Sequence, residues 1–134
     1  MATVFITGAG IRIGSAVARA MGRAGYDLAL HAHRSLKPLE ALAEELRGLG
    51  RQVTLYSADL SEPQAAEELG ARVRADHPTL DAIVHNAGLY ELVDFEAITR
   101  EQYRRMLAVN LDAPFFLTQA LLPSLRASAQ PLVV

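Results

Sequence analysis

Short apolar runs alternate with longer segments of helical periodicity along the whole chain. The runs occupy residues 3–7, 27–32, 52–57, 81–85 and 132–134. Each run is short and almost continuously apolar, which is typical of strands buried on both faces of a sheet. This alternation predicts an α/β fold: a doubly wound parallel sheet whose strands are joined by right-handed helical crossovers.

The first two helices are predicted from the spacing of their apolar residues. One covers residues 11–24, and Gly25 provides a stop signal. The other follows Ser35, a candidate N-cap, and carries leucines at three- and four-residue steps until Gly48.

The remaining helices are predicted from capping signals. Residues 61–64 and 99–102 both read as capping boxes, so we expect a third helix after Ser61 and a fourth that runs to about residue 110. A fifth helix is expected over residues 113–127, with Pro123 as a kink or break.

Composition excludes several classes of protein. The chain has 134 residues, a net charge of −2 and no cysteine, so neither nucleic-acid steering nor a thiolate metal site is expected. No linker interrupts the pattern, which predicts one domain over residues 1–134. We find no continuous apolar run long enough to cross a bilayer and no leader pattern at the N-terminus. The expectation is a soluble cytoplasmic protein without a membrane partner.

A glycine-rich turn lies between the first strand and the first helix. Gly8, Gly10 and Gly14 occur there in the stretch Thr7-Gly8-x-x-x-Arg12-Ile13-Gly14. Glycines at this point let the backbone approach a pyrophosphate, and the free N–H groups of the helix N-terminus face the negative charge. This favours a Rossmann-type dinucleotide site, although a glycine turn without a ligand has the same composition.

The end of the second strand indicates which dinucleotide is bound. NAD-binding folds carry an acid there that accepts the ribose 2′-hydroxyl, but this chain has His33, Arg34 and Ser35. An arginine attracts a 2′-phosphate that a carboxylate would repel, so we expect NADP(H) rather than NAD(H). The alternative is a helix cap preceded by solvated basic residues. His31 and His33 share one strand face, but no nearby cysteine or carboxylate completes a metal set.

Two more motifs follow the third and fourth strands, namely Asp59-Leu60 and Asn86-Ala87-Gly88. The carboxyl ends of strands in open α/β sheets are where ligands bind. Small residues after the fourth strand let the backbone lie against a ligand, and both motifs are therefore predicted to line the cofactor site. The alternative for Asp59 is an acid that is merely favourable near a helix N-terminus.

These motifs together resemble the short-chain dehydrogenase/reductase family. The family carries Thr-Gly-x-x-x-Gly-x-Gly at the first turn, and its pteridine reductase branch has arginine in place of the middle glycine, as Arg12 is here. The resemblance implies that Arg12 reaches toward the cofactor phosphates, and that His33, Arg34 and Ser35 form the NADPH-binding turn. It also implies that Asp59 hydrogen-bonds the adenine, that Leu60 lies along the ring, and that Asn86, Ala87 and Gly88 approach the ribose.

The resemblance assigns roles to two further residues. An aromatic side chain at Tyr90 would stack on a pterin ring, although a loop tyrosine that packs on the following helix is an equally good interpretation. Asn110 matches a family residue that helps to hold a water molecule in the proton relay, and it is our catalytic candidate. Its alternative role is to repair the junction between two helices.

The resemblance also implies the reaction. We expect an NADP(H)-dependent enzyme that transfers hydride to a C=N or C=O group of a small molecule, either a pterin or a ketone. The family's acid is the tyrosine of Tyr-x-x-x-Lys. None of the four tyrosines here has a lysine four residues later, and the only lysine is Lys37, so the acid is expected beyond Val134.

Two alternatives remain beside the pteridine reductase interpretation. Gly88 stands where pteridine reductases often have serine, which favours a general short-chain reductase acting on a 3-oxoacyl group or another ketone. A non-catalytic dinucleotide-binding module would also fit the residues present. Family members often form oligomers through the fourth and fifth helices, so a homodimer or homotetramer is expected.

Overall fold

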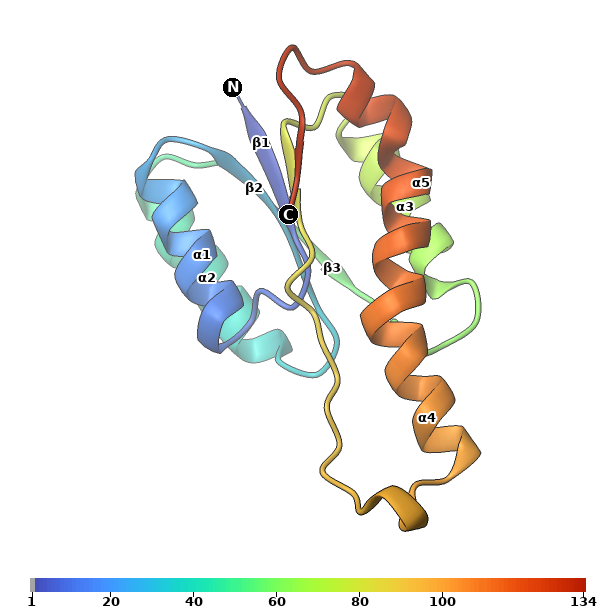
Figure 1. The fold of residues 1–134 in the computed structure, drawn as a ribbon. Coiled ribbons are helices and arrows are strands. Elements are labelled where there is room, and N and C mark those ends of the chain that lie inside the picture. Colours follow the sequence, from blue (N-terminus) through green and yellow to red (C-terminus); the bar gives the residue numbers. More distant parts are fainter. Residues whose placement is uncertain (1) are drawn as a thin grey trace.

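The computed structural model describes residues 2–134 and contains one parallel sheet (Figure 1). The order of its strands is β3-β2-β1-β4-β5. Their bounds are Thr3–Ile6 for β1, Asp27–Ala32 for β2, Val53–Ser57 for β3, Ala82–Val84 for β4 and Leu132–Val133 for β5. This order, with β1 at the centre, is that of the doubly wound Rossmann architecture, and it confirms the predicted fold class.

The strands are nearly continuous apolar runs because helices cover both faces of the sheet. In β1, Val4 and Ile6 contribute to the core on one face and Phe5 to the core on the other, and all three are fully buried. Helices α1 (Arg12–Arg23) and α2 (Leu36–Gly48) cover the first face, whereas α3 (Ala65–Asp76) and α5 (Ala113–Arg126) cover the second (Figure 1).

The predicted fourth and fifth helices are one continuous helix. Helix α4 (Arg100–Leu107) begins at the predicted capping box, in which Thr99 and Gln102 exchange hydrogen bonds. A π-helical turn, Ala108–Asp112, then joins α4 directly to α5. The expected junction near residue 110 is therefore a bulge inside a helix and not a break. Residues 113–126 remain helical through Pro123, which is exposed, so the expected break does not occur there.

This long helix meets the length and composition criteria for a membrane span. It covers Arg100–Arg126, its most apolar window has a mean hydropathy of 1.2, and 17% of that window is buried. Its apolar residues divide between two faces. Leu117, Leu121 and Leu125 pack in the core, whereas Leu111 and Phe115 are exposed to solvent.

One predicted helix cap is wrong, and a second occupies the predicted position without a capping side chain. Helix α3 begins at Ala65 and not after Ser61, because the Ser61 hydroxyl donates to Asp59 Oδ1 at 2.7 Å instead of capping a helix. Ser35 does precede α2, but within residues 2–134 its side chain makes no capping hydrogen bond. Short polar side chains have several local backbone and side-chain partners, so a motif alone does not determine which one is used.

Candidate cofactor-binding site

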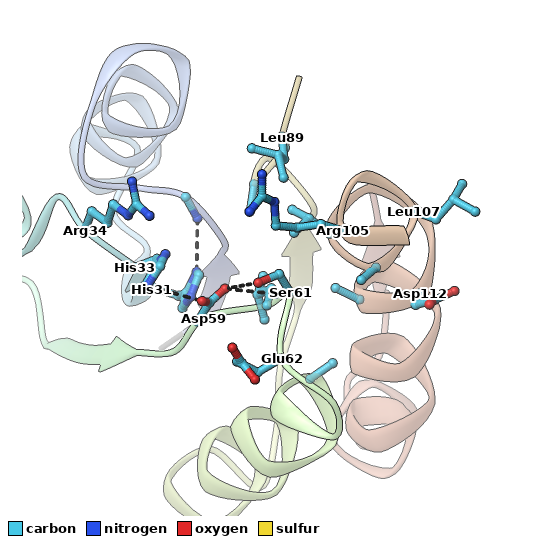
Figure 2. Close-up of a pocket in the computed structure, with 18 of the residues that line it drawn as sticks. His31, His33, Arg34, Asp59, Ser61, Glu62, Leu89, Arg105, Leu107 and Asp112 are labelled. Atoms are coloured by element: carbon cyan, nitrogen blue, oxygen red, sulfur yellow. Dashed lines mark hydrogen bonds and ion pairs between the residues drawn. The ribbon is translucent and has the colours of Figure 1, made fainter. Parts of the chain in front are cut away.

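A cleft of about 1420 Å³ opens at the carboxyl ends of the strands. It lies where the chain crosses from one side of β1 to the other, between β1 and β4, which is where open α/β sheets bind ligands. Most of the predicted cofactor residues line it: Gly8, Arg12, Ile13, His33, Arg34, Ser35, Asp59, Leu60, Asn86, Ala87 and Gly88. Figure 2 shows the β2 and β3 ends facing the α4 wall across this cleft.

The glycine turn is shaped by contacts within the protein. Gly8 has a φ of 64°, a conformation that favours glycine. A Cβ added to Gly14 would lie 2.1 Å from the Gly8 carbonyl oxygen. Gly14, which is not among the cleft-lining residues, therefore lets the first turn of α1 close against Gly8 and has a packing role.

Arg12 occupies an unusual backbone position for a residue with a side chain. Its φ of 52° is left-handed, a conformation that costs about 1–2 kcal/mol for a residue other than glycine. The Ser15 hydroxyl donates to the Arg12 carbonyl at 2.9 Å and helps to hold this geometry. The conformation explains why a glycine is usual in such a fingerprint, and it keeps an exposed guanidinium at the edge of the cleft.

Basic and acidic groups meet where β2 and β3 end. His33 Nε2 lies 3.6 Å from Asp59 Oδ2, and Arg34 is exposed beside it. Asp59 Oδ1 accepts hydrogen bonds from both the hydroxyl and the N–H of Ser61, at 2.7 and 3.0 Å. These bonds hold the pKa of Asp59 below its usual value, so the carboxylate is charged at neutral pH.

Thr7 and Asn86 connect the first and fourth strands. Thr7 Oγ1 accepts from the N–H groups of Asn86 and Ala87, at 3.1 and 3.0 Å, and Asn86 Nδ2 donates to the Gly8 carbonyl at 2.9 Å. The Asn86 side chain is thus used to hold the glycine turn. The role of Thr7 was not predicted from the sequence, although a hydroxyl residue directly after a buried strand is the pattern that could have indicated it.

His31 is a second residue whose part the sequence analysis missed. Its ring is buried, and its two nitrogens lie within hydrogen-bond distance of Gly8 N and of the Ala58 carbonyl, at 3.3 and 2.9 Å. Burial lowers the pKa of His31 below 6.5, so the ring is neutral at physiological pH. The alternation of β2 placed His31 and His33 on one face, but it did not reveal these partners.

Asn110 and Tyr90 do not line the cleft. Asn110 Oδ1 accepts from Leu89 N–H at 2.8 Å and its Nδ2 donates to the Leu89 carbonyl at 2.7 Å, so this side chain fixes the loop after β4. Tyr90 is 82% exposed and is not packed against the following helix. Within residues 2–134 the structure thus shows Asn110 bridging from the continuous helix to this loop and not at a junction between two helices, and it leaves the Tyr90 side chain exposed in the loop.

The wall opposite the strand ends comes from the β4–α4 loop and α4. Arg100, Arg104 and Arg105 line this side, and Arg105 forms an ion pair with Glu91 from the loop. That hydrogen-bonded pairing raises the pKa of Arg105. The sequence shows Arg104 and Arg105 as an adjacent basic pair, but it does not indicate that Glu91 is the partner of Arg105.

The arrangement suits an elongated anion with an attached base. The α1 N-terminus has N–H groups without intrahelical partners, and Arg12 stands beside it. Arg34 provides a second cationic position with His33 beside it, and Asp59 offers a charged acceptor. Two separate cationic positions and one acceptor fit a phosphorylated dinucleotide.

Comparison with known proteins gives a consistent result. Residues 2–134 match the short chain dehydrogenase family. The 3-oxoacyl-(acyl-carrier-protein) reductase FabG of Aggregatibacter actinomycetemcomitans is 37% identical over 111 residues, which are 82% of this chain and 46% of that protein. The chain thus spans about half the length of the curated relatives it matches.

Two solved structures show the same fold with a nicotinamide cofactor. A short-chain dehydrogenase from Sphingobium yanoikuyae in complex with NADPH is 32% identical, with a TM-score of 0.88, over 99% of this chain and 52% of that one. The FolM alternative dihydrofolate reductase 1 from Brucella canis, complexed with NADP, is 26% identical, with a TM-score of 0.89, over 98% and 53%. The sequence match and the shared fold together establish that this chain belongs to the short chain dehydrogenase family.

Proposed function

We propose that this chain binds NADP(H) and forms the cofactor-binding part of a reductase. The observation that carries the proposal is the pair of cationic positions in one cleft, Arg12 at the glycine turn and Arg34 after β2. No acid occupies the turn after β2, where an NAD-binding fold would use one for the ribose. Relatives of the same fold in complex with NADP and NADPH support this cofactor.

Each predicted residue has a task in holding the cofactor. Arg12 and the α1 N-terminus would bind the pyrophosphate, and His33, Arg34 and Ser35 would bind the 2′-phosphate. Asp59 would accept from the adenine amino group while Leu60 lies along the ring. Ile13 and the backbone of residues 86–88 would enclose the ribose and phosphates. The bound cofactor supplies a hydride from its nicotinamide ring to a C=N or C=O group.

A pterin-like substrate is our first choice. Arg12 and the His-x-His-Arg-Ser turn support it because both resemble the pteridine reductase branch. The FolM alternative dihydrofolate reductase 1, a protein of similar fold, also supports it. In this proposal Tyr90 stacks on the pterin once the substrate and cofactor are bound, and Asn110 contributes to the proton relay through its hold on the loop after β4.

A 3-oxoacyl or other ketone substrate is the second choice. The observation in its favour is the 37% identity to a 3-oxoacyl reductase, together with Gly88 in the loop after β4. Dihydrobiopterin and a 3-oxoacyl thioester, each assayed with the complete protein and NADPH, separate the two choices. Binding of NADPH without turnover of either substrate would instead support a dinucleotide-binding module.

We also propose a cytoplasmic homo-oligomer, either a dimer or a tetramer. Tyr103, Leu107, Leu111 and Phe115 are exposed at four-residue steps along the helix of residues 100–126, which places them on one side of it. An exposed apolar stripe of this length is typical of an interface. Sedimentation analysis over a range of concentrations tests this assembly.

Calorimetric titration with NADPH and NADH tests the cofactor proposal. Charge-assisted hydrogen bonds from an arginine to a phosphate contribute about 1.5–3 kcal/mol, so we expect NADPH to bind at least about tenfold more tightly than NADH. Equal affinities for the two cofactors would contradict the proposal.

A further inference from the structure

His31 is the only residue that links both ends of the proposed site through its side chain within the described range 2–134. It lies in β2, which sits between β1 and β3 in the sheet. Its ring contacts Gly8, in the turn proposed to face the phosphates, and Ala58, the residue before Asp59. With 2% of its surface exposed, His31 is held in one position by the surrounding core.

The two partners of His31 allow only one protonation state. The Gly8 N–H can only donate, so Nδ1 must accept from it, and the Ala58 carbonyl can only accept, so Nε2 must carry the proton. A protonated ring would place a second N–H against the Gly8 N–H and break this contact. The ring is therefore the neutral Nε2–H tautomer.

The same residue also fixes the next amide of the turn. The Ala9 N–H donates to the His31 carbonyl at 2.8 Å, and the Gly8 carbonyl accepts from Asn86 Nδ2. The polar groups of Gly8 and the Ala9 N–H are thus all used inside the protein. The later N–H groups, at the start of α1, remain for a ligand.

We infer that His31 is a positioning residue for the cofactor: its neutral imidazole holds the phosphate-facing turn and the adenine-facing loop at a fixed separation. The inference rests on the proposed function. A dinucleotide spans both ends of the cleft, so its affinity depends on that separation. A ligand that occupies one end only does not.

Two conservative substitutions separate the two contacts. In His31→Asn the amide oxygen stands near the position of Nδ1 and can accept from Gly8, but the bond to Ala58 is lost. In His31→Gln the amide nitrogen reaches the position of Nε2 and can donate to Ala58, but the bond to Gly8 is lost. Each variant of the full chain therefore retains one end of the link.

Calorimetry with NADPH and with adenosine 2′-monophosphate provides the readout. Adenosine 2′-monophosphate carries the base and the 2′-phosphate but does not reach the glycine turn. We expect His31→Gln to lower the affinity for NADPH by about fivefold, the factor that one neutral hydrogen bond supplies. Its affinity for adenosine 2′-monophosphate should change by less than about twofold. In His31→Asn, which loosens the base end, both ligands should weaken by a similar factor.

Three results have distinct meanings. If His31→Gln lowered the affinities for both ligands by the same factor and also lowered the thermal stability, His31 would have only a structural role and the inference would be wrong. If wild-type protein bound NADPH no better than NADH, the proposed function would fail instead. If the variants do not fold, ¹⁵N NMR of the histidines in the wild-type protein tests the inference. We expect the Nε2–H tautomer at His31, and the Nδ1–H tautomer would overturn the inference.

Discussion

The two walls of the cleft are held by different kinds of contact. The inner wall comprises the β1–α1 turn and the ends of β2, β3 and β4, and the buried side chains of Thr7 and His31 join these elements. The outer wall comprises residues 89–98 and α4. Its contacts are mostly exposed, including the Arg105–Glu91 pair and both Asn110 bonds.

This difference indicates which wall has a fixed shape before a ligand binds. Buried, fully paired hydrogen bonds are costly to break, whereas an exposed ion pair contributes about 0–1 kcal/mol. In the loop that carries the outer wall, the side chains of Tyr90, Leu92 and Phe95 lie outside the cleft lining and are 82, 89 and 93% exposed. We therefore expect the inner wall to be preorganised for the cofactor and the outer wall to be shaped by what binds to it.

Substitution of Gly14 by alanine should produce the largest loss of stability. The new Cβ would meet the Gly8 carbonyl at 2.1 Å, so the inner wall must shift, at a cost of about 3 kcal/mol or more. Gly48→Ala is the matched control, because no atom of residues 2–134 outside its own helix and its chain neighbours would lie within 4 Å of its Cβ. Urea unfolding measures both variants; equal stabilities for the two would show that the turn is not tightly closed.

Thr7→Val should have the next largest effect. The substitution keeps the shape of the side chain but removes the acceptor of two N–H groups, those of Asn86 and Ala87. Leaving these donors unpaired should cost about 2 kcal/mol in the free energy of unfolding. Thr79→Val, at an exposed site, is the control and should change stability by less than about 0.5 kcal/mol. If Thr7→Val left the free energy of unfolding unchanged, the hydroxyl of Thr7 would not hold the inner wall.

The inner wall should also be sensitive to acid. The pKa of His31 in the folded chain lies below the unfolded value of 6.5, because burial favours the neutral ring. As the pH falls below 6.5, the unfolded chain therefore takes up a proton that the folded chain excludes. Stability decreases by at most about 1.4 kcal/mol per pH unit for this histidine until the folded pKa is reached.

Comparison with His31→Asn isolates this contribution. Burial also lowers the pKa of His77 and His85, and their effect is present in both proteins. Urea unfolding at several pH values between 7 and 5 should therefore give a shallower pH dependence for the variant. If the free energy of unfolding changed with pH by the same slope in both proteins, His31 would be protonated equally in the folded and unfolded chains.

The sequence predicted the inner wall better than the outer wall. Strand positions follow from continuous apolar runs, and the strand order of a doubly wound sheet then brings the ends of β1, β2, β3 and β4 together. Gly8, Arg34 and Asp59 could therefore be placed in one site from their positions after predicted strands. Glycine patterns further indicated the turn, because close backbone packing at Gly14 leaves no room for a side chain.

Features that depend on side-chain geometry could not be predicted in this way. The link made by His31 requires knowledge of its ring orientation between two neighbouring strands. The Arg105–Glu91 pair joins positions 14 residues apart through a loop of irregular backbone. The continuity of α4 with α5 depends on a π-helical turn, which has no strong composition signal, so Asn110 appeared to lie between two helices.

The smallest effect on folding is expected on the exposed stripe that continues from the outer wall. Leu111 is 61% exposed, so Leu111→Ser should change the unfolding free energy of the isolated chain by no more than about 0.5 kcal/mol. Leu121→Ala, on the buried face of the same helix, should cost about 2–5 kcal/mol. Sedimentation should then show a smaller assembly for Leu111→Ser only. An unchanged assembly would contradict the proposed interface.

We propose that Arg12, whose backbone is strained, binds a cofactor phosphate, and this claim can be tested with a single substitution. Arg12→Gly removes the side chain and the left-handed strain together, so the free energy of unfolding should change by less than about 1 kcal/mol. Calorimetric titration with NADPH should nevertheless show about tenfold weaker binding. Arg126→Gly, at the far end of α5, is the control and should leave the affinity unchanged. An Arg12→Gly protein that binds NADPH as tightly as the wild type would contradict the claim.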